Sequence, residues 1–174
     1  MVVVLIIAMM AMITMPLLQE QIAAREIDSL ARRFIYHARF ARQQALHLGE
    51  PILLTPHYER ASDARSWDDG WVVQSGCIGK LSKFECIPKY WFSQGVIRPI
   101  YFKGGGKQFT DPHTGKRGIL FNAAGAAKTA QGGFVANRLI LGHQRVPRLE
   151  RQLILGSGGR WRICDPARDA KRCH

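Results

Sequence analysis

The sequence lacks the short motifs by which common catalytic sites are recognised. The glycine-rich segments "KGGGK" (Lys103–Lys107) and "TGKRG" (Thr114–Gly118) do not have the G-x-x-x-x-G-K-[ST] spacing of a nucleotide-binding loop. Ser157 lies in "GSG" rather than in G-x-S-x-G, and the six histidines are scattered along the chain. We therefore expect loops at the glycine-rich segments, and we predict that the protein is not an enzyme and uses no cofactor.

Acidic residues are also scarce. The chain of 174 residues has 13 Asp and Glu against 25 Lys and Arg, which gives a formal net charge of +12. A positive charge of this size attracts polyanions, chiefly nucleic acids and anionic lipid headgroups. A generally basic proteome or compartment would explain the same charge, so the charge alone does not choose a partner.

Cysteine is rare, and no cysteine pair has C-x-x-C spacing. The four cysteines are Cys77, Cys86, Cys164 and Cys173, and eight residues separate the two members of each pair. This spacing does not favour a zinc site, and we predict no metal site. Disulfides are the better interpretation. Three connectivities are possible, of which two short local loops are the simplest, and disulfides indicate an oxidising compartment.

The first 18 residues, "MVVVLIIAMMAMITMPLL", contain no charge. As a helix with a rise of 1.5 Å per residue, this segment would span about 27 Å, close to the thickness of the hydrocarbon core of a bilayer. It lacks the basic start and the small-residue cleavage site of a secretory signal. We therefore predict an uncleaved membrane anchor over residues 1–18.

Residues 19–48 are predicted to continue the same helix as an amphipathic segment. The apolar residues recur at three- and four-residue steps, which places them on one face of a helix. They are Ile27, Leu30, Ala31, Phe34, Ala38, Ala41, Ala45 and Leu48. Gly49 and Pro51 then supply a stop signal. We predict one long helix whose second part packs on the rest of the protein.

The orientation of this anchor raises a conflict. Arg25, Arg32 and Arg33 all follow the apolar run, and basic residues favour the cytoplasmic side of a membrane. That orientation would place the cysteines in the reducing cytosol. A short basic leader before Met1 would remove the conflict, because it would hold the N-terminus inside.

Residues 49–174 are predicted to form a β-rich globular domain with a basic C-terminal tail. Strand-like runs separated by Gly- and Pro-rich turns are Ile52–Leu54, Trp71–Gln74, Ile119–Phe121, Arg138–Leu141, Gln152–Leu155 and Arg160–Ile163. The short connections favour antiparallel pairing, and "LILGSGGRWRI" is typical of a hairpin with its turn in "GSGG". The predicted fold class is α+β, with an antiparallel sheet packed on the amphipathic half of the helix.

The C-terminal strand carries two arginines on one face. In an extended strand, Arg160 and Arg162 point to one side and Trp161 and Ile163 to the other, so we expect the second pair to face the core. The two arginines would stand about 6.6–6.8 Å apart, which suits neighbouring phosphates of a nucleic acid. The plainer interpretation is that they are ordinary solvated residues of the last strand.

Several segments together resemble a known family. The apolar start "MVVVLIIAMMAMITMP", "ARFARQQALHLGEPILLTP", "GW" at Gly70–Trp71, "ILFNAAGAA" and "LILGSGGRWRIC" are similar to segments of type IV minor pilins of the FimT/FimU kind. The related GspH-type minor pseudopilins of type II secretion share this resemblance. It covers nearly the whole chain and is least distinctive from Gly76 to Arg117. It implies a pilin-like fold, a single inner-membrane span with a periplasmic globular domain, and assembly with other minor and major pilins at or near the tip of a pilus.

One feature of the family is missing from the sequence. Such proteins normally begin with a short basic leader, a Gly-Phe cleavage site and an early glutamate in the apolar stretch, and Met1–Leu18 has none of these. We expect that the start codon has been placed at an internal methionine. Processing by prepilin peptidase and N-terminal methylation are therefore implied only for a longer product.

The resemblance also bears on the two arginines. In the FimT-type branch, a C-terminal Gly-Arg-x-Arg motif is associated with DNA binding during uptake in natural transformation, and "GRWR" at Gly159–Arg162 matches it. Non-specific binding of double-stranded DNA through its phosphates is thus expected. The expected DNA-binding residues are Arg160, Arg162, Arg168, Lys171 and Arg172. Two alternatives stay open, namely a minor pilin or pseudopilin that primes filament assembly without binding DNA, and a membrane-anchored periplasmic enzyme.

Overall fold

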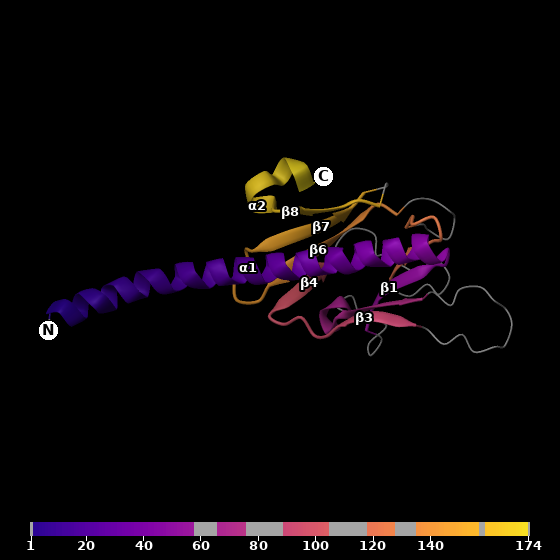
Figure 1. Cartoon of the computed structure of the whole chain (residues 1–174). Coiled ribbons are helices and arrows are strands. Elements are labelled where there is room, and N and C mark those ends of the chain that lie inside the picture. The colour runs from indigo at the N-terminus through magenta and orange to yellow at the C-terminus, as the bar shows by residue number, and fades with distance from the viewer. Residues whose placement is uncertain are drawn as a thin grey trace.

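A long helix crosses two antiparallel sheets in the computed structural model of the chain (Figure 1). The structure describes residues 2–57, 66–75, 89–104, 118–127, 135–156 and 159–173. Within these ranges, the side chains of residues 2–17, 104 and 172 are not described. The predictions for Cys77, Cys86, Ser157 and most of the two glycine-rich segments fall on residues outside this description.

The helix α1 spans Val2–Leu48, close to the length predicted from the sequence. It ends at Gly49, whose φ of 66° lies in the left-handed region that glycine adopts without strain. Its apolar face is buried as predicted, with one exception. Leu48 is 46% exposed, because it is the last residue of the helix and the chain turns away there.

The strands form two sheets of four strands each, and every pairing is antiparallel. The first sheet has the order β3-β2-β1-β5 and the second has the order β4-β6-β7-β8. The strands are β1 (Ile52–Pro56), β2 (Trp71–Ser75), β3 (Tyr90–Gln94), β4 (Ile100–Gly104), β5 (Ile119–Phe121), β6 (Asn137–His143), β7 (Glu150–Leu155) and β8 (Trp161–Cys164). Three short helices complete the described chain, namely η2 (Ser66–Asp69), α2 (Pro166–Asp169) and η3 (Ala170–Cys173).

The α+β fold and the antiparallel pairing confirm the prediction, but there are two sheets rather than one. The strands β3 and β4 were not predicted. Tyr90 of β3 is exposed, and Trp91 and Phe92 are only partly buried, so this strand lacks the alternation of apolar and polar residues by which strands are recognised.

One aromatic side chain of α1 lies at the centre of the core. The ring of Phe34 lies 5.0 Å from that of Trp71 in the first sheet and 5.5 Å from that of Trp161 in the second, measured between centroids. It also contacts Trp67 of η2 and Phe102 of β4, at 5.6 Å and 6.1 Å. The two sheets therefore share a single core beneath the helix.

The inner face of β8 was predicted only in part. Trp161 is buried as expected, but Ile163 is 37% exposed, which corrects the prediction that it packs in the core. β8 is the edge strand of its sheet, and an edge strand has a neighbour on one side only. Ile163 therefore lies on the inner face without being covered.

The described side chains of α1 begin at Leu18, after most of the uncharged run. Among the residues searched, no helix is both long enough and apolar enough to cross a membrane. The predicted anchor at residues 1–18 falls largely on side chains outside the description, so it stays a prediction.

Candidate nucleic-acid interface

The candidate interface lies at the hairpin of β7 and β8. Leu155 is paired with Trp161 and Ile154 with Arg162. The turn closes with two backbone hydrogen bonds, from Gly156 N to Arg160 O at 3.0 Å and from Gly159 N to Gly156 O at 2.9 Å. The predicted hairpin is confirmed, and β8 begins one residue later than predicted.

The turn before Arg160 is attached to the long helix by Arg42. The Arg42 Nε donates to the carbonyl of Gly125 at 2.9 Å, and its Nη1 donates to the carbonyl of Gly159 at 3.3 Å. Gly159 has a φ of +73°, and a Cβ added there would lie 3.3 Å from the Arg42 guanidinium. The positive φ thus favours glycine, and any larger residue would also require the Arg42 guanidinium to shift by a few tenths of an ångström. Nothing in the sequence pattern indicated the role of Arg42.

Both arginines of "GRWR" are exposed, as predicted. Arg162 points to the outer face of the sheet, because the next residue back, Trp161, is buried on the inner face. Arg160 precedes β8 and follows the glycine turn. Among the described residues, no carboxylate pairs with the guanidinium of Arg160.

The C-terminal tail folds back next to β8. Cys164 and Cys173 form a disulfide with a Cα–Cα distance of 5.5 Å, which confirms this predicted pair. Asp165 caps α2, because its Oδ1 accepts a hydrogen bond from the backbone N–H of Ala167 at 3.0 Å. Both cysteines are 5% exposed, so the tail is closed over the outer side of this end of β8.

The basic residues of the tail follow the end of β8 that is opposite Arg160. Arg168 and Lys171, two of the expected DNA-binding residues, are exposed, and the side chain of Arg172 lies outside the description. Arg168 is 87% exposed, and its Nε lies 3.7 Å from Asp165 Oδ2, which offsets part of its charge. The part of the tail that carries these residues is closed back onto the end of β8 by the Cys164–Cys173 disulfide.

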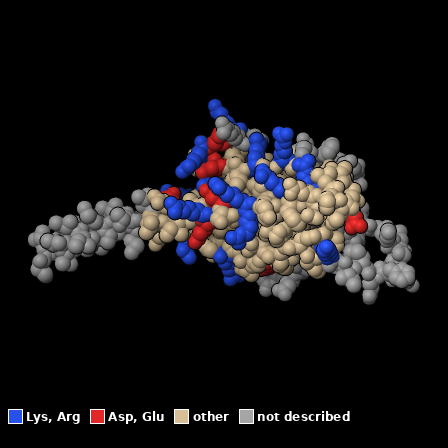
Figure 2. Space-filling model, viewed as in Figure 1, with Lys and Arg blue, Asp and Glu red and all other residues tan. Residues whose placement is uncertain are grey.

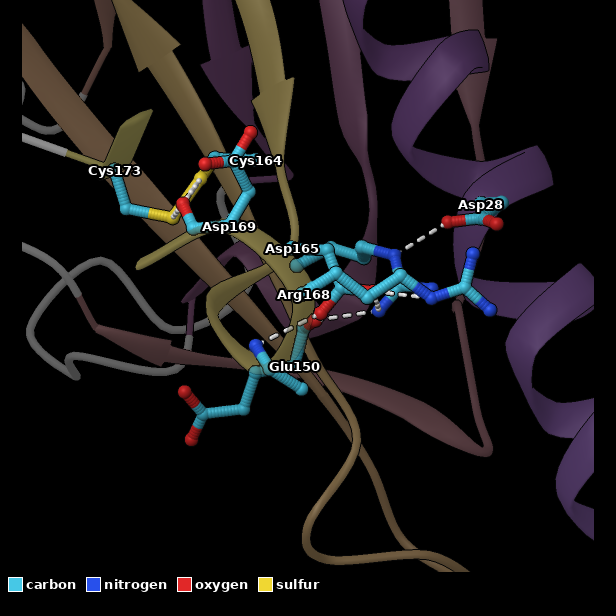
Figure 3. A network of polar contacts seen from close by, with 9 residues as sticks. Asp28, Glu150, Cys164, Asp165, Arg168, Asp169 and Cys173 are labelled. Carbon is cyan, nitrogen blue, oxygen red and sulfur yellow. Dashed lines mark hydrogen bonds and ion pairs between the residues drawn. A yellow bond between two sulfur atoms is a disulfide. The ribbon is translucent and has the colours of Figure 1, made fainter. Parts of the chain in front are cut away.

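Arg151 belongs to the basic C-terminal region of the sequence, but it is not available to a ligand. Its side chain points to the inner face and is 9% exposed. Its Nε lies 2.6 Å from Asp28 Oδ1 of α1, and its Nη1 lies 3.1 Å from Asp165 Oδ2 (Figure 3). It therefore joins the helix, β7 and the tail, and acts as a structural residue.

Charged side chains are not evenly distributed over the surface. In Figure 2, acidic side chains gather between α1 and the C-terminal tail, whereas Lys and Arg side chains continue along α1 and towards the edge formed by β8. Three acidic residues of α1 have basic or histidine partners on the second sheet or its loops. They are Glu20 with Arg148, Glu26 with His143, and Asp28 with Arg151.

Sequence reasoning missed one exposed arginine on the same face as Arg162. Arg138 lies on β6, where it is opposite Ile154, and Ile154 is in turn opposite Arg162 on β8. The sequence places Arg138 in a predicted strand. Only the pairing of β6 with β7 and of β7 with β8, which the sequence does not give, shows that Arg138 lies beside Arg162.

Comparisons with known proteins bear on the fold. No family model matches the sequence, and neither does any curated protein. The chain is similar to the crystal structure of the type IV minor pilin FimU of Pseudomonas aeruginosa, with a TM-score of 0.52, 15% identity and coverage of 83% of this chain and 92% of that chain. It is also similar to the minor pseudopilin EpsH of the type 2 secretion system of Vibrio cholerae, with a TM-score of 0.52, 10% identity and coverage of 81% and 98%. The chain has the fold of the type IV minor pilins and minor pseudopilins.

Proposed function

We propose that this protein is a minor pilin of a type IV pilus that binds extracellular double-stranded DNA through its C-terminal arginines. The observation that carries the proposal is the placement of Arg160 and Arg162. Both are exposed at the β7–β8 hairpin, and no described carboxylate neutralises Arg160. The pilin-like fold supports a role in a filament, with other pilins as partners.

The chemistry of these side chains suits phosphate. A guanidinium group presents a planar fork of donors, which matches the oxygens of a phosphate group. Such contacts hold the backbone of DNA and do not read bases, so binding is expected to be largely independent of sequence. Uptake of DNA from outside the cell would need this kind of binding.

The location follows from the same proposal. The uncharged run at residues 1–18 would anchor the protein in the inner membrane, and the globular domain would lie in the periplasm before entry into the pilus. The disulfide between Cys164 and Cys173 agrees with an oxidising compartment. Prepilin peptidase would be a partner of a longer product that carries a leader.

The proposal is tested by DNA binding to the purified full chain in a neutral detergent, measured by fluorescence anisotropy with a labelled duplex over a range of salt concentrations. The variant is Arg160→Gln with Arg162→Gln. The matched control is Arg25→Gln with Arg32→Gln, which removes two exposed arginines from α1 and so lowers the net charge equally. We expect the first variant to bind all duplexes more weakly and to reduce the slope of log affinity against log salt by about 1.8, or about 0.9 per contact.

The second candidate function is a structural one, in which the protein primes filament assembly and binds no DNA. One observation favours this second function. The fold is as similar to that of a secretion pseudopilin as to that of a pilus protein, because both comparisons give a TM-score of 0.52. If the double glutamine variant binds DNA as well as the parent, or as well as its control, the arginines form only a solvated surface and this second function replaces the first.

A further inference from the structure

A row of side chains crosses the outer face of the second sheet at the candidate site. It runs from Arg138 on β6 to Ile154 on β7 and Arg162 on β8, with each residue directly opposite the next. All three point outward, because their neighbours Leu139, Leu153, Leu155 and Trp161 are buried on the inner face. The row is therefore fixed by strand register and not by the conformation of a loop.

Arg138 and Arg162 of this row lie close to each other and to Arg160. Neighbouring strands lie about 4.8 Å apart, so the Cα atoms of Arg138 and Arg162 are about 9.6 Å apart across two strands. Arg160 lies about 6.6–6.8 Å from Arg162 along the chain. The half-buried side chain of Ile154 lies between Arg138 and Arg162 on this face.

The next row of the same face is different. It contains Ile140, Gln152 and Cys164, and the last two are buried at 9% and 5% exposure. The tail is joined to Cys164 by the disulfide, so it lies at the β8 end of this row. Glu150, the carboxylate of β7, lies farther along the strand and is paired with Lys103.

Arg138 itself is exposed, and no described side chain pairs with its guanidinium. Arg138 is therefore not part of the core, and it holds no ion pair within the described part of the chain. Its charge is directed into the same solvent as that of Arg162. These features fit a residue that contacts a ligand shared with its neighbours.

We propose that Arg138 is a third phosphate-binding arginine, and that the backbone of the bound duplex runs across β8, β7 and β6 rather than along β8 alone. The inference rests on the proposed function, because it assigns a further residue to the same DNA-binding surface. The inference also changes the extent of the predicted DNA-binding surface. β6 becomes part of this surface, and the C-terminal tail lies at its edge.

The test compares Arg138→Gln with Arg32→Gln in the full chain in neutral detergent, with the same labelled duplex. Both variants lose one exposed arginine, but Arg32 lies on α1, which packs on the inner faces of the sheets. We expect Arg138→Gln to weaken binding about 8-fold at 0.1 M salt, to have little effect near 1 M salt, and to lower the salt slope by about 0.9. Arg138→Lys should keep most of the affinity, because it keeps the charge.

The outcomes separate this inference from the proposed function. If Arg160→Gln with Arg162→Gln weakens binding but Arg138→Gln behaves like Arg32→Gln, Arg138 is not a contact and only this inference is wrong. If the parent itself does not bind DNA, both are wrong. Thermal unfolding of each variant shows whether it is folded under the binding conditions. The salt slope is a second control, because loss of folded molecules lowers the amount of binding without changing this slope.

Discussion

Arg151 and Arg162 lie on adjacent strands of the same sheet, but their side chains leave it on opposite faces. Arg151 points to the inner face, where it meets Asp28 and Asp165 at 2.6 Å and 3.1 Å. Arg162 points outward and is exposed. The same residue type is therefore buried between parts of the fold on one face and exposed on the other.

This difference shows why a count of basic residues does not define a binding surface. Residues 145–174 contain eight Lys and Arg against three Asp and Glu. Of the arginines, however, Arg148 and Arg151 are engaged with carboxylates from α1, and Arg168 lies near Asp165. The neighbours that the fold brings to an arginine, and not its place in a basic segment, therefore decide which role it has.

The inner face of β8 should be the most sensitive to substitution. Trp161→Ala removes a buried ring that contacts Phe34, at a centroid distance of 5.5 Å, and we expect a loss of about 3–5 kcal/mol in the free energy of unfolding. Urea unfolding followed by circular dichroism measures this loss. Ile163→Ala is the control on the same face, and because Ile163 is partly exposed it should lose less than about 1 kcal/mol. Equal losses would contradict the assignment of Trp161 alone to the core.

Substitution of Arg151 should change stability and leave DNA affinity unaltered. Arg151→Gln breaks charged hydrogen bonds to Asp28 and Asp165, so we expect the free energy of unfolding to fall by about 2–3 kcal/mol. DNA binding, measured where the variant is fully folded, should match that of the parent. A stable Arg151→Gln variant with weakened DNA binding would remove the distinction between the two faces.

The sequence predicted the elements of this fold better than their arrangement. The period of apolar residues in α1 is a local property, and it located the buried face correctly apart from the terminal residue Leu48. The hairpin around "GSGG" and the pair Cys164–Cys173 are likewise local, since their partners are close in the chain. Two sheets instead of one could not be predicted, because the choice of strand partners depends on contacts between distant segments.

The same limit applies to the candidate site. Arg160 and Arg162 were identified from the alternation of one strand, which needs no knowledge of its neighbours. Arg42 and Arg138 were missed, because one contacts Gly159 from a distance of 117 residues and the other is placed only by the register of β6 and β7. The burial of Arg151 was not predicted either, since no local pattern indicates that Asp28, 123 residues away, lies across from it.

His37 on α1 provides a smaller effect on stability, one that depends on pH. Its Nδ1 accepts a hydrogen bond from Trp71 Nε1 at 2.9 Å, and burial, followed by the nearby charge of Arg33, lowers the pKa of the imidazole below its usual 6.5. The unfolded chain therefore binds the proton more readily, so stability should be full above pH 6.5 and should fall as the pH drops towards the lowered value.

Chemical unfolding at pH 7.5 and pH 5.0 measures this effect. In His37→Gln, which does not titrate, the difference in free energy of unfolding between the two pH values should be smaller than in the parent. His47→Gln is the control, since His47 is exposed near the end of α1. An unchanged pH dependence in the His37 variant would show that other groups determine it.

The smallest expected effect on stability belongs to the outer face. Arg160→Gln and Arg162→Gln should each change the free energy of unfolding by no more than about 0.5 kcal/mol, because both side chains are exposed and neither fills the core. Each should nevertheless reduce the salt slope of DNA binding by about 0.9, since each contact with a phosphate releases counterions. Unfolding and binding must be measured on the same preparations, so that the two effects are compared directly. If either variant lost more than about 2 kcal/mol, its arginine would resemble Arg151 in supporting the fold, and the contrast between the two faces of the sheet would no longer hold.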